Sequence, residues 1–127
     1  MESPKTIQTY TNPDEPIQTP GIQVSSENSQ IQAFDIDKLA LAVAWAETGN
    51  CTKGSAISHN NCFGIMTWHR GFRELKHYNS HEESFEDFKR IWLEKYDGHP
   101  SYYAAQRWTG NPKPDNWLKI VDFYYFN

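Results

Sequence analysis

The chain has 127 residues, with 12 basic and 16 acidic side chains and a formal charge of −4 at pH 7. This length suits a single domain, and the acidic balance excludes a general nucleic-acid binder, which needs a basic surface. Aromatic residues are unusually frequent, because they make up 15% of the chain against a hydrophobic total of 38%. We therefore expect aromatic rings to fill much of a small core.

The first 32 residues differ from the rest in composition. They contain no Trp, Phe or Leu, and four acidic residues against one lysine place most of the net negative charge there. Such a segment buries too little apolar surface to offset the entropy of ordering it. The composition predicts a disordered or extended arm over residues 1–32 and a near-neutral domain over residues 33–127. An arm that packs along the domain is the alternative.

Residues 36–48 are predicted to form a buried helix. Apolar side chains recur at helical spacing on nearly all sides, Asp35 can cap the first turn, and Gly49 follows the last turn. Residues 51–64 are rich in turn formers and predict an ordered loop with one short helical turn. Residues 65–68 and 72–78 flank His69-Arg70-Gly71, which predicts an antiparallel hairpin.

Three further helices are predicted after the hairpin. Ser80 and Glu83 have the spacing of a capping box before a helix over 81–96. A shorter helix is expected over 101–108, and Asp115 can cap a final one. The predicted fold is mostly α (α+β), with four to five helices and one inserted hairpin. Four large rings are expected in the core, namely Trp45, Phe85, Phe88 and Trp92. No stretch is long and apolar enough for a membrane segment, and no export signal precedes the domain.

Glu47 is the residue whose position calls for a chemical explanation. It lies at the end of an otherwise apolar helix, where the helix dipole opposes a carboxylate. Burial raises the pKa of a carboxyl group, and a neutral carboxylic acid near pH 7 can protonate a leaving glycosidic oxygen. The alternative is a Glu that faces solvent or pairs with Lys53.

Two cysteines, Cys51 and Cys62, lie 11 residues apart in the loop after this helix. A disulfide suits an exported protein, whereas two buried thiols suit a cytosolic one. Zinc binding is not indicated, because no pair of cysteines has the usual spacing of zinc ligands.

Four segments, taken in order, resemble the glucosaminidase-type peptidoglycan hydrolases, which share the lysozyme-like fold with lytic transglycosylases. They read AETGN, SHNNCFGI, FR and YNSHEESFEDF, at residues 46–50, 58–65, 72–73 and 78–88. Thr48 and Cys62 stand where this family usually has Ser and Leu. The resemblance implies a lysozyme-like domain and favours a Cys51–Cys62 disulfide, which would pin the loop after Glu47 to the Phe63-Gly64 turn.

By this resemblance Glu47 is the general acid that cleaves β-1,4 bonds between N-acetylglucosamine and N-acetylmuramic acid. Glu74 is the expected second carboxylate, unless it is an exposed strand residue paired with a neighbouring cation. If the substrate's own acetamido group or C6 hydroxyl attacks instead, a late tyrosine, Tyr124 or Tyr125, is expected to orient the acid. Residues expected to contact sugar are Asn60, Asn61, Phe63, Trp68, Tyr78, Tyr103, Trp108 and Asn111.

The resemblance implies an enzyme that acts as a monomer on peptidoglycan glycan strands, without cofactor or metal and without nucleic-acid partners. Its expected location is extracytoplasmic, in the wall, the periplasm, the medium or a phage particle. Two alternatives stay open. One is a lytic transglycosylase that forms 1,6-anhydro products, and the other is a non-catalytic wall-binding module on the same fold.

Overall fold

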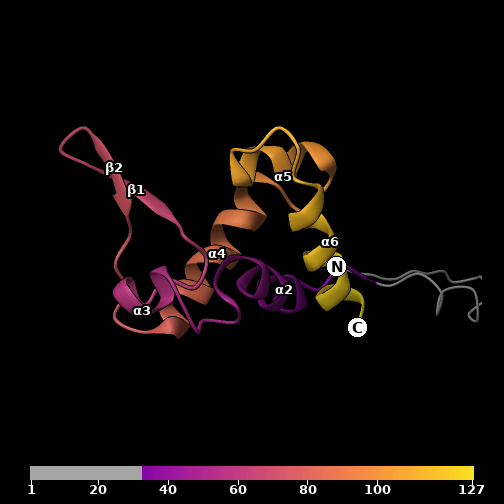
Figure 1. Ribbon diagram of the computed structural model, residues 1–127, viewed down its shortest axis with the longest axis horizontal. Helices are drawn as coiled ribbons and strands as arrows, with labels where there is room; N and C mark the ends of the chain where they lie inside the picture. Colours follow the sequence, from indigo (N-terminus) through magenta and orange to yellow (C-terminus); the bar gives the residue numbers. More distant parts are fainter. Residues whose placement is uncertain (1–32) are drawn as a thin grey trace, which may run out of the picture. The chain divides into compact units, whose positions relative to one another are not determined.

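The computed structural model describes residues 33–127, which contain five helices and one two-stranded antiparallel sheet (Figure 1). In chain order these are α2 (Ile36–Thr48), α3 (Ser55–His59), β1 (Met66–His69), β2 (Phe72–Leu75), α4 (His81–Lys95), α5 (Tyr102–Thr109) and α6 (Asp115–Phe126). This confirms the predicted α+β class with one inserted hairpin. The predicted arm over residues 1–32 lies outside the described residues.

Helix α2 is the central buried helix, as its apolar sequence predicted. The Asp35 carboxylate accepts hydrogen bonds from the backbone N–H groups of Asp37 and Lys38, and Gly49 ends the helix in the left-handed conformation. The helix packs mainly against α6, where the Tyr125 hydroxyl accepts a hydrogen bond from the Asp35 N–H at 2.9 Å. These contacts fix α2 and α6, the first and last described helices, against one another.

The loop after α2 is tied down covalently and by hydrogen bonds. Cys51 and Cys62 form a disulfide that spans the loop containing α3. Thr48, which is buried, donates its hydroxyl to the Cys62 carbonyl at 2.8 Å and accepts from the Cys51 N–H at 3.1 Å. The loop end is thus fixed beside Glu47, the penultimate residue of α2.

A thiol assay tests this bridge directly. The unfolded, unreduced chain is expected to show no reactive sulfhydryl, and a reductant should release two per molecule, because the chain has only two cysteines. Two titratable thiols before reduction would contradict the disulfide.

The hairpin is shorter than predicted. His69 belongs to β1 and pairs with Phe72, so the turn consists of Arg70 and Gly71 alone. Both have positive φ, 54° and 83°, which matches the twist of a two-residue hairpin turn. The second strand ends at Leu75, although the Lys76 N–H still bonds to the Ile65 carbonyl at 2.9 Å. The hairpin extends away from the helices in Figure 1.

Helix α4 supplies two rings, Phe88 and Trp92, to a row of packed aromatic residues. Its cap is Ser80, as predicted, whose hydroxyl accepts from the Glu83 N–H. The ring of Phe63 stacks on Phe88 at 4.5 Å between ring centroids, and Phe88 in turn stacks on Trp92 at 5.7 Å. Phe88 and Trp92 are fully buried, whereas the other two predicted core rings, Trp45 and Phe85, are half-buried. This row packs α4 against the Phe63-Gly64 turn.

The last two helices have different starts. Ser101 caps α5 through a bond from the Ala104 N–H, which confirms the predicted boundary to within one residue. The N-cap of α6 is Pro114, not Asp115, which is the first helical residue. The Asp115 carboxylate instead accepts from the Tyr102 hydroxyl at 3.2 Å, so it links α6 to α5. None of the described helices has the length and apolarity needed to cross a membrane.

Candidate functional site

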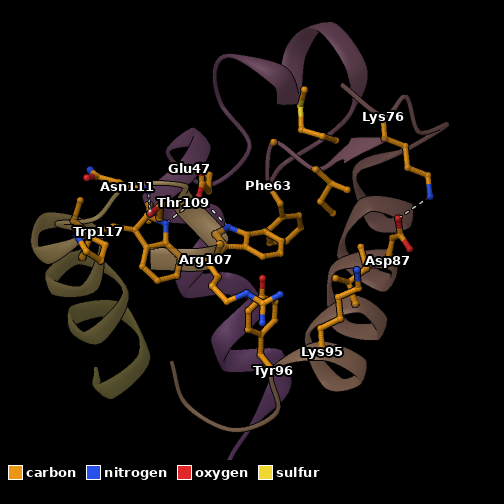
Figure 2. Close-up of a pocket in the computed structure, with 18 of the residues that line it drawn as sticks. Glu47, Phe63, Lys76, Asp87, Lys95, Tyr96, Arg107, Thr109, Asn111 and Trp117 are labelled. Atoms are coloured by element: carbon orange, nitrogen blue, oxygen red, sulfur yellow. Dashed lines mark hydrogen bonds and ion pairs between the residues drawn. The ribbon is translucent and has the colours of Figure 1, made fainter. Parts of the chain in front are cut away.

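A groove of about 860 Å³ lies over the end of α2. Its lining comes from α2, the Phe63-Gly64 turn, the hairpin, α4, α5 with the loop after it, and α6. Four aromatic residues line it, namely Phe63, Tyr96, Trp108 and Trp117, of which Phe63 is buried and the other three are half-buried. Figure 2 shows Glu47 between Phe63 on one side and Trp117 on the other. The groove therefore combines a carboxyl group with ring surfaces of the kind that stack on sugars.

Glu47 is half-buried and is held by two indole N–H groups. Trp117 Nε1 donates to Glu47 Oε2 at 2.9 Å, and Trp108 Nε1 donates to the same oxygen at 3.1 Å. Burial raises the pKa of Glu47 above its ordinary value, and the two indole bonds only partly offset this increase. The side chain is therefore a carboxylic acid poised to hold its proton to higher pH than a surface Glu.

The two indole bonds also decide which oxygen carries the proton. An indole N–H can only donate, so Glu47 Oε2 must accept from both tryptophans. Its two in-plane lone pairs are then occupied, which leaves Oε1 as the protonated oxygen. Oε1 lies toward Gly64, 4.0 Å from where a Cβ on that residue would be. The acidic proton is thus directed to the side of the carboxyl that faces the Phe63-Gly64 turn.

The structure brings some of the predicted site residues together. Glu47, Phe63, Trp108 and Asn111 all line the groove, although they come from four separate parts of the chain. Trp108 does more than offer a ring to sugar, because its indole also holds Glu47.

Glu74 and Tyr124, the other two predicted catalytic residues, are not among the lining residues. The Glu74 carboxylate is half exposed and lies 2.8 Å from His69 Nδ1 on the facing strand. Tyr124 stacks on Trp45, with 4.6 Å between ring centroids and 3° between planes. The place expected for an orienting tyrosine beside the acid is taken by the two tryptophans.

The predicted asparagines hold the loop that precedes the hairpin. Asn61 is fully buried, and its amide bonds to four backbone groups: it donates to the carbonyls of Ile65 and Lys76 and accepts from the N–H groups of Phe63 and Ile65. Asn60 donates to the Tyr78 carbonyl at 3.0 Å. Both asparagines therefore shape the turn that carries Phe63 and lie outside the groove lining.

Three more rings predicted to contact sugar lie outside the groove lining. Tyr78 is buried, and its hydroxyl donates to the Asp87 carboxylate at 2.5 Å. Trp68 on the hairpin and Tyr103 on α5 are 70% and 66% exposed.

Sequence reasoning missed Asp87, the second carboxylate of the groove. It accepts from Lys76 at 2.9 Å and from Arg90 at 2.6 Å, as well as from Tyr78. Burial alone would raise the pKa of Asp87, but the bonds from Tyr78, Lys76 and Arg90 together lower it to about 2. Asp87 is thus ionised and bonded to its neighbours, whereas burial favours the protonated form of Glu47.

Trp117, on α6, is the nearer of the two indole donors to Glu47. Substituting it with phenylalanine removes one of the two donors that lower the pKa of Glu47, so that pKa is expected to rise further. The change can be measured without substrate, by following the Glu47 carboxyl carbon by NMR during a pH titration. Trp68→Phe, on the exposed hairpin, is the matched control and should leave the titration unchanged. An unaltered Glu47 titration in Trp117→Phe would contradict the indole contact.

Comparison of the chain with protein-family models, with curated proteins and with solved structures found no match.

Proposed function

We propose that this protein is a peptidoglycan hydrolase that cleaves β-1,4 bonds between N-acetylglucosamine and N-acetylmuramic acid, with Glu47 as the general acid. The observation that carries the proposal is the environment of Glu47. Burial favours its protonated form, two indoles fix its orientation, and it opens into a groove lined by aromatic rings. The resemblance of the segments around Glu47 to glucosaminidase-type hydrolases supports the same activity.

In the proposed reaction, Glu47 Oε1–H gives its proton to the glycosidic oxygen as the bond from that oxygen to the anomeric carbon breaks. The carboxylate that results carries its new charge beside the two indole N–H groups, which stabilise it more strongly than they stabilise the neutral acid. In hydrolysis, a water oxygen then bonds to the anomeric carbon and its proton returns to Glu47. The disulfide supports an extracytoplasmic setting for this reaction.

A lytic transglycosylase is the second candidate, and one observation favours it. Among the described residues, the groove holds only one carboxylate besides Glu47, and that carboxylate, Asp87, is already bonded by two cations and a tyrosine. Glu74 pairs with His69 and lies outside the groove lining. The substrate itself is therefore the best candidate for the nucleophile that attacks the anomeric carbon. Attack by the C6 hydroxyl of the muramic residue would form a 1,6-anhydro ring.

Mass spectrometry of the soluble products from purified peptidoglycan tests these proposals. A reducing N-acetylglucosamine end identifies a glucosaminidase, and a reducing N-acetylmuramic acid end identifies hydrolysis of the other β-1,4 bond. A 1,6-anhydro end identifies a transglycosylase. Recovery of intact strands bound to the protein, with no new ends, would contradict an enzymatic role and indicate a wall-binding module.

A further inference from the structure

Positive charge gathers on the groove. Residues 33–127 are near neutral, with 11 basic and 12 acidic residues, yet six of those basic residues and only two of the acidic ones line the groove. The six are Arg73, Lys76, Arg90, Lys95, Arg107 and Lys113. Cleft walls that carry one sign of charge focus their field on a bound ligand. The groove is therefore built to receive negative charge.

Among residues 33–127, ion pairs satisfy only two of these cations. Lys76 and Arg90 both pair with Asp87. The other four have no carboxylate within 4.0 Å among the residues that the structure describes, and all four are exposed. Their charge is available to a ligand.

Arg107 is the best positioned of the four. Its guanidinium lies over the rings of Tyr96 and Tyr103, 5.5 and 5.8 Å from their centroids. Stacking on two rings reduces the freedom of the side chain and leaves its N–H groups for a planar anion, and a carboxylate matches them in bidentate geometry. Lys95 comes from α4, next to Tyr96, and Figure 2 shows both cations near that ring, away from Glu47.

The catalytic acid does not account for this charge. Burial and the two indole bonds account for the raised pKa of Glu47. N-acetyl sugars are neutral, so their rings and amides have no need of four positive groups that lack a carboxylate partner among the described residues. The anion must be carried on another part of the ligand.

We propose that Arg107 and Lys95 bind carboxylates attached at the muramic position of the glycan strand. The carboxylate has two possible sources, the stem peptide or the lactyl group that is freed when the peptide is removed. The inference rests on the proposed function, because it takes the peptidoglycan strand as the ligand of this groove. It adds that the protein distinguishes strands by their charge as well as by their sugars.

Binding is best measured in the Glu47→Gln background, so that strands are not consumed. Isothermal titration calorimetry would compare intact soluble strands, strands whose carboxylates are converted to amides with carbodiimide and ammonia, and strands freed of peptide by an amidase. If the stem peptide supplies the carboxylate, intact strands should bind on the order of tenfold more tightly than amidated ones, with a difference that shrinks as salt is added, and amidase-treated strands should bind as weakly as amidated ones. If the lactyl group supplies it, amidase-treated strands should bind more tightly than both, because the lactyl carboxyl is blocked as an amide in intact strands.

Two double variants with the same change in net charge complete the test. Lys95→Gln with Arg107→Gln should remove the preference for strands that carry the recognised carboxylate over amidated strands. Lys53→Gln with Lys119→Gln, at exposed cations outside the groove lining, should retain it. Equal affinity for intact, amidated and amidase-treated strands, or an equal loss in both double variants, would overturn the inference while cleavage by the wild-type chain upheld the proposed function. If no strand is bound or cleaved, the proposed function fails and the inference fails with it.

Discussion

Glu47→Gln is expected to lower the turnover of purified peptidoglycan by about 10² to 10⁴-fold, because glutamine cannot donate a proton to the leaving oxygen. The substitution preserves shape, since an amide oxygen can still accept from the indoles of Trp108 and Trp117. The loss should therefore be chemical and not structural.

The same variant has a distinctive effect on stability. Burial raises the pKa of Glu47 in the folded state above its unfolded value, so folding favours the protonated form. The contribution of Glu47 to the free energy of unfolding is then greatest below the unfolded pKa and is lost as the pH rises through the folded pKa. Glutamine does not ionise, so the thermal midpoint of Glu47→Gln should match the wild type near pH 4 and equal or exceed it near pH 8.

Glu74→Gln is the matched control, a second Glu→Gln change on an exposed strand residue outside the groove lining. Its turnover should stay within about threefold of the wild type. A loss of several orders of magnitude would instead identify Glu74 as the second carboxylate that the family resemblance implies.

The second large effect is expected at Asn61. Asn61→Ala removes a fully buried amide that joins four backbone groups, and it leaves several of them without partners. We expect the free energy of unfolding to fall by about 3 to 5 kcal/mol. Chemical denaturation of the two chains measures this difference.

Asn79→Ala provides the comparison, because it is the same substitution at an exposed residue, just before helix α4. Its free energy of unfolding should change by less than about 0.5 kcal/mol. If Asn61→Ala were equally mild, the buried amide network would not hold the turn that carries Phe63 and Gly64.

Local signals in the sequence were sufficient to predict most of the elements. Asp35 and Ser80 each cap a helix where the sequence predicted a cap, since a cap depends only on the next three residues, and α5 begins within one residue of its predicted start. The start of α6 was the exception. Asp115 has the residue type of a cap, but its carboxylate bonds to Tyr102, and that partner is set by tertiary packing.

The candidate site was only partly predictable, because its contacts join distant residues. Glu47 could be singled out from its own surroundings, as an acid at the end of an apolar helix. Trp117 is 70 residues away and Trp108 is 61 residues away, so no local pattern connects their indoles to Glu47. Asn61 is the reverse case. We expected its amide to contact sugar, but in the structure that amide makes its hydrogen bonds to backbone groups.

Helix α4 shows why the charge of the groove could not be predicted either. Residues 81–96 contain five acidic and three basic residues, and only the docking of α4 decides that Arg90 and Lys95 line the groove. An amphipathic pattern indicates which side of a helix is buried, but not which of its polar residues border a cavity.

Digestion of purified peptidoglycan in H₂¹⁸O, followed by mass spectrometry of the saccharide ends, tests the role of Glu47 most directly. The wild-type chain is expected to form many new ends per molecule of protein, each with one ¹⁸O if water attacks, or with a 1,6-anhydro ring and no ¹⁸O if the C6 hydroxyl attacks. Glu47→Gln is expected to form almost none. Ends that appear equally with both chains, or with neither, would contradict Glu47 as the acid of a glycan-cleaving enzyme.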